Sequence, residues 1–381
     1  MLTGNDIICI STNSWNFLRT RKQRFMNMLA DNGNRVLFVD PIISPIPKKR
    51  NPEFYPNTTI HAVLRNVKKS LYLLTPPFGL PLSRYPLICR INQNIQWKCI
   101  VKWQEKLGFY NPIMWVYDPR CAYFLNRLRM KLLVYDCVDE HPSYPGVNRK
   151  EITKLEKSLI GFSDIVFVTA RSLLESKKRY NPHVFYVPNG VDFWTYSKNS
   201  TSLRELDEMR QIPRPRLGFV GGIHSWTDLD LVYYLAKANP GWSLVLVGPV
   251  GHDADISKVK NQRNVYFVGY KEPEIVPSYI RSFDVCLNIF KVNEMTRKVN
   301  PVKIYEYLAA GKPVVSVNLP EVCLLKTVYI AESYSDFLDK VNFALSEDKR
   351  IMCSQRMREA SSYSWERLLE QISHHIESRL R

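Results

Sequence analysis

The sequence predicts an α/β protein of two domains, each built on a doubly wound parallel sheet. Short apolar segments alternate with segments of helical periodicity along most of the chain. The alternation is interrupted in the polar, proline-containing stretch 197–215 and then starts again. The length of 381 residues suits two domains of ordinary size. We therefore expect an N-terminal domain over 1–196, a linker over 197–215 and a second domain over 216–362.

The first domain opens as a Rossmann-like half does. An expected strand over 6–11 is followed by the polar loop 12–15, a helix from about 18 to 31 and a second strand over 36–39. The glycine-rich fingerprint of dinucleotide-binding proteins is absent from this loop. The sequence therefore does not support a dinucleotide cofactor.

A long basic helix is expected over 84–107. It carries both basic and apolar or aromatic residues, namely Arg84, Arg90, Lys98, Lys102 and Lys106 alongside Tyr85, Ile91, Ile95, Trp97 and Trp103. Helices of this kind lie in membrane interfaces, but the pattern is also typical of a helix that packs on its own sheet. Both interpretations stay open. The other elements expected in this domain are the loop 41–58, strands at 59–67, 70–74, 112–117, 131–135, 163–169 and 183–187, and helices at 151–160 and 172–180.

Two of these strands, 112–117 and 131–135, lead into acidic residues. Asp118 follows the first strand, and Asp136 and Asp139 follow the second. Ligands of open parallel sheets bind beyond the carboxyl ends of the strands, and crowded carboxylates there acquire pKa values useful to a general base. The alternative is that these aspartates cap a loop and pair with nearby arginines.

The second domain repeats the alternation, and glycines follow several of its strands. A glycine at such a position lets the backbone approach a ligand closely. The glycines are Gly221, Gly222, Gly248 and Gly269. The expected strands are 216–220, 242–247, 264–268, 284–289 and 314–317, and the expected helices are 229–238, 272–280, 333–346 and 348–360.

The stretch 300–315 is predicted to form a helix followed by a buried strand. Pro301 suits the first turn of the helix, and Gly311 suits its end. Lys303 and Glu306 are three residues apart and share one face near the helix start. A helix start with a lysine favours phosphate, and a glutamate binds a pair of sugar hydroxyls, so the pattern indicates a nucleotide site. The alternative is a Lys–Glu surface pair on an ordinary helix.

The segment 301–315, Pro-x-Lys-x-x-Glu-Tyr-Leu-Ala-x-Gly-x-Pro-Val-Val, resembles the nucleotide-sugar site of GT-B glycosyltransferases. The resemblance is to the family-4-like and xanthan glucuronosyltransferase-like group that builds bacterial surface polysaccharides. Pro-Asn-Gly-Val-Asp at 188–192 and Leu-Pro-Glu at 319–321 resemble turns of the same group. The resemblance implies two Rossmann-like domains that face a cleft, with a C-terminal helix over 363–381 that crosses back to the N-terminal domain.

The resemblance also implies roles for individual residues. Glu306 would hold the ribose of the donor, and Asp139 would act as the catalytic base toward the acceptor hydroxyl. The other donor-side residues would be Lys303, Tyr305, Gly221, Gly222, His224, Gly248, Tyr270, Thr296 and Arg297. The acceptor side would comprise Ser14, Trp15, Arg19, Asp118 and His141, with Arg21 as a further candidate. The alternative is that Arg19, Arg21 and Arg297 are solvated charges and that His224 is an ordinary loop residue.

The chain departs from the retaining members of this group at one position. They carry a second glutamate eight residues before the ribose-binding one, where this chain has Lys298. This departure and the available Asp139 favour inversion of the configuration at the anomeric carbon, whereas the motif at 301–315 favours its retention. The stereochemistry of the reaction therefore stays open. We expect no cofactor and no metal, because Lys303 and helix termini would stabilise the leaving diphosphate.

The chain is strongly basic, with 53 Lys and Arg against 36 Asp and Glu and a net charge of +17. Nucleic acid, anionic lipid and phosphorylated small molecules are the partners that such a charge suits. No nucleic-acid-binding motif is visible, so we expect no nucleic-acid partner. We expect instead a nucleotide sugar, a saccharide or polyprenyl-linked saccharide acceptor, and an anionic membrane surface.

Apolar runs are too short to cross a bilayer, no leader pattern opens the chain, and the eight cysteines are scattered. A cytoplasmic, peripheral position on the inner face of the plasma membrane is therefore expected. The predicted function is a glycosyltransferase that moves a sugar from a nucleoside-diphosphate sugar, with UDP favoured, in cell-surface polysaccharide synthesis. The alternatives are a GT-B-fold nucleotide-sugar epimerase and a non-catalytic basic protein that binds membrane or nucleic acid.

Overall fold

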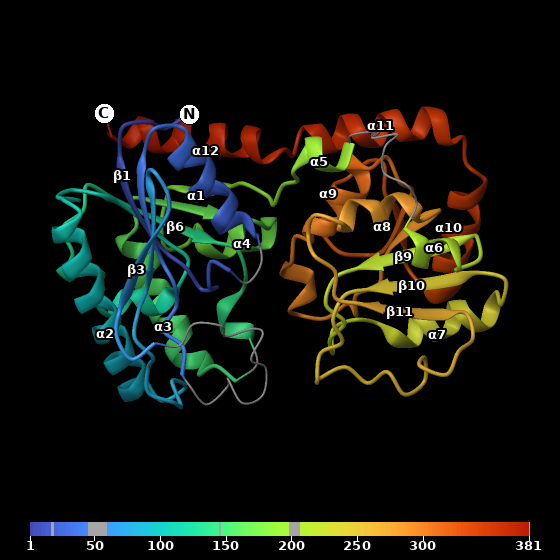
Figure 1. Ribbon diagram of the computed structural model, residues 1–381, viewed down its shortest axis with the longest axis horizontal. Coiled ribbons are helices and arrows are strands. Elements are labelled where there is room, and N and C mark those ends of the chain that lie inside the picture. Colours follow the sequence, from blue (N-terminus) through green and yellow to red (C-terminus); the bar gives the residue numbers. More distant parts are fainter. Residues whose placement is uncertain (17–18, 45–58, 145, 198–205, 381) are drawn as a thin grey trace. The chain divides into compact units, whose positions relative to one another are not determined.

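The computed structural model describes residues 1–16, 19–44, 59–144, 146–197 and 206–380. The chain divides into two compact units (Figure 1). Unit 1 comprises Met1–Pro188 with Glu366–Arg381, and unit 2 comprises Asn189–Trp365. The division thus falls after Pro188, earlier than the expected end of the first domain at 196. The reason is that Val191 and Tyr196 are buried in the hydrophobic core of unit 2.

Unit 1 contains a mixed sheet with the strand order β3-β4-β2-β1-β5-β6-β7-β8. Neighbouring strands are parallel except β3 and β4, which form an antiparallel edge pair. The strands are β1 (Asp6–Ile10), β2 (Arg35–Val39), β3 (Val63–Lys68), β4 (Leu71–Thr75), β5 (Ile113–Val116), β6 (Leu132–Cys137), β7 (Ile165–Val168) and β8 (Val184–Tyr186).

Helices cover both faces of this sheet, which explains why its central strands are apolar on both sides. Phe25 of α1 approaches the ring of Trp115, and His375 of α12 stacks on Phe185 at 3.9 Å. Ile100 of α2 and Leu159 of α3 belong to the core cluster that faces the other way. The helices are α1 (Arg21–Asp31), α2 (Pro86–Lys106), α3 (Arg149–Phe162), α4 (Arg171–Lys177) and α12 (Trp365–Leu380), with short 3-10 turns η3 (Pro119–Tyr123), η4 (Leu125–Arg127) and η5 (His141–Ser143).

The long helix α2 buries a largely polar face. The buried residues include Asn92, Gln93 and Gln96. Trp97 and Trp103 are half-buried against the core of unit 1, and the guanidinium of Arg127 lies 3.4 Å from the Trp97 ring centroid. The tryptophans therefore pack on their own unit, which was the second of the two interpretations of this helix.

Unit 2 contains a parallel sheet with the order β11-β10-β9-β12-β13-β14. Helix α7 contacts α10, and α9 contacts α11 and α5. The strands are β9 (Arg216–Val220), β10 (Ser243–Val247), β11 (Val265–Gly269), β12 (Val285–Asn288), β13 (Val314–Val317) and β14 (Tyr329–Ala331). The helices are α5 (Phe193–Ser197), α6 (Asp207–Arg210), α7 (Leu229–Ala238), α8 (Val276–Ser282), α9 (Val302–Ala309), α10 (Tyr334–Ser346) and α11 (Lys349–Ser361), with the 3-10 turn η6 (Thr296–Lys298).

Several element bounds differ from expectation. Helix α1 begins only at Arg21, after the Thr20 cap, and the expected start at 18 lies outside the described residues. Most of the expected loop 41–58 and part of the expected linker also lie outside them, and 207–210 of that linker form α6. Strand β14 was not among the strands expected from the sequence. Within the described part of the chain, no helix combines the length and apolarity that a membrane crossing requires.

Candidate functional site

The motif helix α9 stands beside the carboxyl end of β9 in unit 2. The hydroxyl of Tyr307, on α9, accepts a hydrogen bond of 2.8 Å from the Val220 N–H at the end of β9. Pro301 is the residue that caps α9 rather than part of its first turn, with φ −75° and ψ 113°. Gly311 ends the helix with φ +71°, and a side chain there would collide with Cys353 of α11. Close packing therefore fixes the start and the end of this helix.

Lys303 places its ammonium group against the turn that follows β9. Its Nζ lies 3.8 Å from the ring centroid of Phe219 and 4.6 Å from that of Phe290. A Cβ at Gly221, where φ is +139°, would lie 2.6 Å from this Nζ. Burial lowers the pKa of Lys303 to about 7, although Glu306 acts in the opposite direction. The site therefore holds a lysine that is only partly protonated at neutral pH. A bound anion would stabilise its charged form.

Gly221 and Gly248 pack against each other at the ends of neighbouring strands. Gly248 has φ +145°, and a side chain there would collide with the Gly221 carbonyl group. The Gly221 N–H donates to Val247 at 2.9 Å, and the Gly248 N–H donates to Gly269 at 2.9 Å. Gly248 is thus required by strand-end packing, whereas Gly221 leaves room for Lys303.

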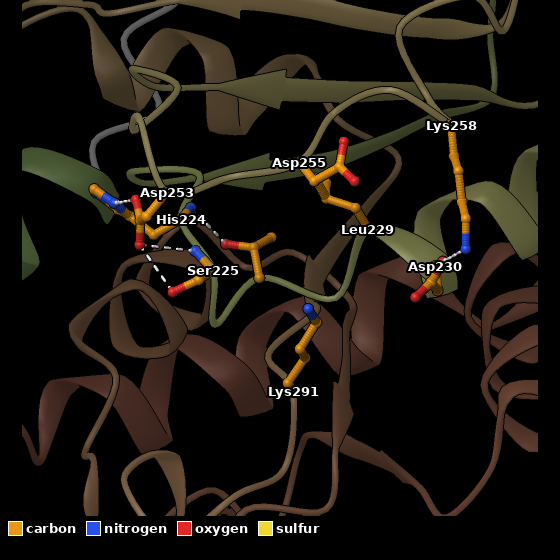
Figure 2. Close-up of a pocket in the computed structure, with 9 residues that line it drawn as sticks. His224, Ser225, Leu229, Asp230, Asp253, Asp255, Lys258 and Lys291 are labelled. Carbon is orange, nitrogen blue, oxygen red and sulfur yellow. Dashed lines mark hydrogen bonds and ion pairs between the residues drawn. The ribbon is translucent and has the colours of Figure 1, made fainter. Parts of the chain in front are cut away.

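His224 lies on the same turn and is held by two neighbours. Its ring stacks on Trp226 at 4.4 Å, and its Nδ1 lies 2.8 Å from Asp253 Oδ1. Slight burial acts to raise the pKa of Asp253, but hydrogen bonds from His224 and Ser225 outweigh it and hold that pKa well below its usual range. Figure 2 shows Asp253 between His224 and Ser225 at the edge of a cavity of about 170 Å³.

The sequence analysis did not identify the acidic residues of this cavity. Asp-x-Asp occurs at 228–230 and at 253–255. Asp230, Asp253 and Asp255 line the cavity, where Lys258 pairs with Asp230 at 2.6 Å (Figure 2). The repeated Asp-x-Asp spacing was the signal that could have found them. Among the described residues, no His, Cys, Asp and Glu side chains gather in a group of three or more that could hold a metal ion.

Three motifs of unit 2 meet at one buried residue, Asn300. Its Oδ1 accepts from the Asn189 N–H at 3.1 Å, and Asn189 Nδ2 donates to the Asn300 carbonyl at 2.8 Å. Its own Nδ2 donates to Tyr305 Oη at 2.9 Å and reaches Glu321 Oε2 at 3.5 Å. Asn300 therefore ties the turns at 188–192 and 319–321 to the start of α9, a role that the sequence analysis did not assign.

Two of the expected donor-side residues point into the unit. Tyr305 is buried and packs on Tyr363 at 4.8 Å, besides its bond to Asn300. Thr296 is buried, and its hydroxyl donates to the Lys291 carbonyl at 2.6 Å. Both side chains are therefore used to build the fold. Tyr270 and Arg297 are exposed, and the Tyr270 hydroxyl lies 3.3 Å from Glu272 Oε2.

In unit 1, two of the acids beyond the strands are paired with arginines. Asp136 is fully buried and accepts from Arg21 Nε at 2.9 Å, and Arg21 also donates to the carbonyl of Pro188. Arg21, offered by the sequence as an acceptor-side candidate with a solvated charge as the alternative, is thus buried and pairs within unit 1. Asp118 bonds Arg120 at 2.7 Å. Burial raises the pKa of Asp118, but the charge and hydrogen bonds of Arg120 outweigh it and lower that pKa.

Asp139 has a different environment. It is half-buried, and its Oδ2 accepts a hydrogen bond of 2.6 Å from the Tyr144 hydroxyl. Burial raises its pKa, against the opposing effects of Tyr144 and of the charge on Lys22. The neighbouring His141 is buried, which lowers its pKa to about 3, and its Nε2 has no hydrogen-bond partner within the described part of the chain. Of these two, Asp139 has a raised pKa, which is the direction that favours a general base.

The loop after β1 is anchored by an acid that the sequence analysis missed. Asp40, just beyond β2, accepts from the Trp15 N–H at 2.8 Å, and burial raises its pKa to about 6. The Trp15 ring lies edge-on to Phe38 at 4.8 Å. The Ser14 carbonyl accepts from Gln23, and Arg19 is exposed. An acid directly after an apolar strand was the signal for Asp40, as it was for Asp118.

A buried lysine near these acids was missed as well. Lys22 Nζ donates to Thr12 Oγ1 at 2.5 Å and lies 5.2 Å from the Tyr117 ring centroid. Burial lowers the pKa of Lys22, while Asp139 raises it. The sequence gives Lys22 no distinguishing pattern, since it stands in a run of basic residues.

Solved structures match the fold over nearly the whole chain. Sucrose-phosphate synthase from Thermosynechococcus elongatus has a TM-score of 0.72 at 12% identity and covers 98% of this chain and 99% of its own. Anabaena HepE in complex with UDP-glucose has a TM-score of 0.69 at 14% identity, over 98% of this chain and 100% of its own. The chain has the GT-B fold. The expected fold class is therefore confirmed.

Sequence comparisons cover smaller parts of this GT-B protein. Residues 214–346 match the family described as glycosyl transferases group 1. TuaH of Bacillus subtilis (strain 168), named as a teichuronic acid biosynthesis glycosyltransferase, is 34% identical over 155 residues. That match spans 39% of this chain and 38% of the length of TuaH. The segment that matches this family lies within unit 2 and contains α9, Gly221 and His224.

Proposed function

We propose that this GT-B protein is a glycosyltransferase that moves a sugar from a nucleoside-diphosphate sugar to a saccharide or lipid-linked saccharide acceptor in cell-surface polysaccharide synthesis. The observation that carries the proposal is the packing of the Lys303 ammonium against the Gly221 turn, one helical turn before Glu306. A UDP-sugar is the favoured donor, in keeping with the UDP-glucose bound to HepE. The name of TuaH supports the polysaccharide context.

Unit 2 would bind the donor. The first N–H groups of α9 and Lys303 would bind the diphosphate, because both supply positive charge at one place. Glu306 would accept hydrogen bonds from the two ribose hydroxyls. The glycines at 221 and 222 would let the backbone approach the phosphates. His224, fixed by Asp253, is a further candidate for phosphate contact. Lys303 would also stabilise the diphosphate as it leaves, so the reaction would need no metal.

Unit 1 would bind the acceptor through the residues beyond its parallel strands. In an inverting reaction, the acceptor oxygen forms a bond to the anomeric carbon while the bond from that carbon to the diphosphate breaks. The proton of the acceptor hydroxyl passes to Asp139, whose raised pKa suits it to the task. In a retaining reaction the same leaving group departs, and Asp139 would orient the acceptor. A cytoplasmic location and the absence of a nucleic-acid partner stay predictions.

Calorimetric titration with UDP, GDP, CMP and ADP tests the donor assignment. One nucleotide should bind the wild type, and Glu306→Ala should weaken its binding at least tenfold, since two hydrogen bonds to a charged group are lost. Asp339→Ala, which removes an exposed carboxylate from α10 of the same unit, is the matched control and should bind as the wild type does. If no nucleotide binds the wild type, the proposal is wrong. Transfer of labelled sugar to an added acceptor separates a transferase from an epimerase.

A further inference from the structure

Large apolar side chains are exposed along 78–91, the loop before α2 and the first turns of that helix. We call this segment the apolar patch. Its exposed members are Phe78, Leu80, Leu82, Tyr85, Leu87 and Ile91. Leu87 and Ile91 are four residues apart on α2 and therefore share one face. Their exposed fractions are 71% and 40%, so the described chain leaves much of both side chains uncovered.

The backbone of the apolar patch is firmly held. Asn92 accepts from the Leu80 N–H at 2.8 Å and donates to the Leu80 carbonyl at 2.9 Å. The Phe78 N–H donates to the Thr59 carbonyl at 2.8 Å. Leu82 alone among the described non-glycine residues has a positive φ, +65°. A leucine in that conformation is strained, and such strain is a reason to look for a function.

The inner face of α2 explains why these apolar groups point outward. Asn92, Gln93 and Gln96 occupy the buried side of the helix, where apolar residues would ordinarily lie. The apolar side chains of the first turns are consequently left on the exposed side. Within the described part of unit 1, each of the six side chains of the apolar patch keeps an exposed fraction of 40% or more.

Charge indicates what covers the apolar patch. Residues 54–104 contain no Asp or Glu and seven Lys and Arg. The patch itself includes exposed Arg84 and Arg90. A second copy of the chain would bring like charges together, which opposes self-association. Surfaces that bind single-stranded nucleic acid combine cations with aromatic side chains on which the bases stack, whereas this patch is mainly aliphatic. Cations beside aliphatic side chains suit the head groups and acyl chains of an anionic bilayer.

We propose that the apolar patch inserts its side chains into an anionic membrane surface, with Arg84 and Arg90 on the lipid phosphates. The interaction places the chain where a lipid-linked acceptor would be found, but it does not depend on the donor site. The contact expected from the sequence ran along the whole helix 84–107. The proposal keeps only its beginning and excludes Trp97 and Trp103, since those side chains pack on unit 1.

Vesicle flotation tests the proposal, with neutral phosphatidylcholine vesicles compared with vesicles that contain phosphatidylglycerol as well. The wild type should float with the anionic vesicles, and less so at high salt. The triple variant Leu82→Ser, Leu87→Ser, Ile91→Ser should lower the partition constant at least 100-fold, because it removes the apolar insertion. The double variant Arg84→Gln, Arg90→Gln should lower it about 30-fold.

The matched control replaces exposed apolar residues outside the patch, in Phe162→Ser and Ile351→Ser, and should bind as the wild type does. Calorimetric UDP binding and thermal unfolding establish that each variant is folded, so a failure of the donor assignment would be seen separately. Equal binding of wild type to neutral and anionic vesicles, or of the triple variant and wild type to anionic vesicles, would overturn the proposal. So would a concentration-dependent dimer in sedimentation velocity that the triple variant abolishes.

Discussion

The charge state of Lys303 gives a prediction that links the donor site to pH. With a pKa of about 7, this lysine is about half protonated at pH 7 in the free protein. A bound diphosphate favours the charged ammonium, so binding should take up about half a proton at pH 7. At pH 8.5 only about 3% of the lysine is protonated before binding. The UDP affinity should therefore fall about 15-fold between pH 7 and pH 8.5.

The neutral variant Lys303→Met removes the charge with little change of shape. It should weaken UDP binding by about 2–3 kcal/mol below pH 7, the usual value for a hydrogen bond to a charged group. Its affinity should also lose the pH dependence. Calorimetry in two buffers of different ionisation enthalpy measures both the affinity and the proton uptake. If wild type and Lys303→Met show the same slope of affinity against pH, Lys303 does not bind the phosphate.

The same variant should affect stability in the opposite direction. The pKa of Lys303 is lower in the folded protein than its ordinary value of 10.5. The unfolded chain therefore binds more protons between these two pH values, and stability rises with pH across that range. Below pH 7 the full cost of burying the ammonium is present. Lys303→Met should thus raise the free energy of unfolding most at pH 6, and a urea titration at pH 6 and pH 10 should show the gain shrinking.

Three further predictions concern single residues. Asp139→Asn should lower kcat about 10²- to 10⁴-fold with UDP affinity unchanged, and a variant that keeps a tenth of the activity would exclude Asp139 as the base. Asn300→Ala should destabilise unit 2 by about 1–3 kcal/mol in urea unfolding, because Asn189 and Tyr305 lose their buried hydrogen-bond partner. Asn261→Ala, at an exposed asparagine, is the control. If the two variants lower the free energy of unfolding equally, the structural role assigned to Asn300 is wrong. Arg356→Met should cost about 3–5 kcal/mol by leaving the Glu347 carboxylate buried without its cation, and a thermal unfolding midpoint within about 1 °C of wild type would refute this.

The sequence predicted the elements whose signals are local. The helix at 302–309 and the strand at 314–317 follow from apolar spacing and from Gly311, which are contained within a few residues. The same reasoning found the acids beyond β5 and β6. The alternation of strands and helices was enough to predict the parallel sheet of unit 2 and the parallel part of the sheet of unit 1, because right-handed crossovers leave few other topologies.

Partners far apart in the sequence were not predictable in this way. Arg21 looked solvated, yet its carboxylate partner, Asp136, is 115 residues away. Asn300 and Asn189 are 111 residues apart, so neither carries a local signal. Helix α2 left two interpretations open for a related reason, because Asn92 on its buried polar face bonds backbone groups of Leu80 in the preceding loop. Periodicity describes which residues share a face but does not state what that face contacts.

The start of α9 and the turn after β9 are the proposed binding site of the donor nucleotide. Hydrogen–deuterium exchange with and without saturating UDP tests it most directly, since a bound phosphate protects N–H groups that the free helix leaves without intrahelical partners. We predict new protection of the N–H groups of Val302, Lys303 and Gly222, since their neighbours Ile304, Gly221 and Ile223 already donate within the free protein. This protection should be lost in Lys303→Met at the same UDP concentration. Protection that appears elsewhere in unit 2, with these two segments unchanged, would contradict the account.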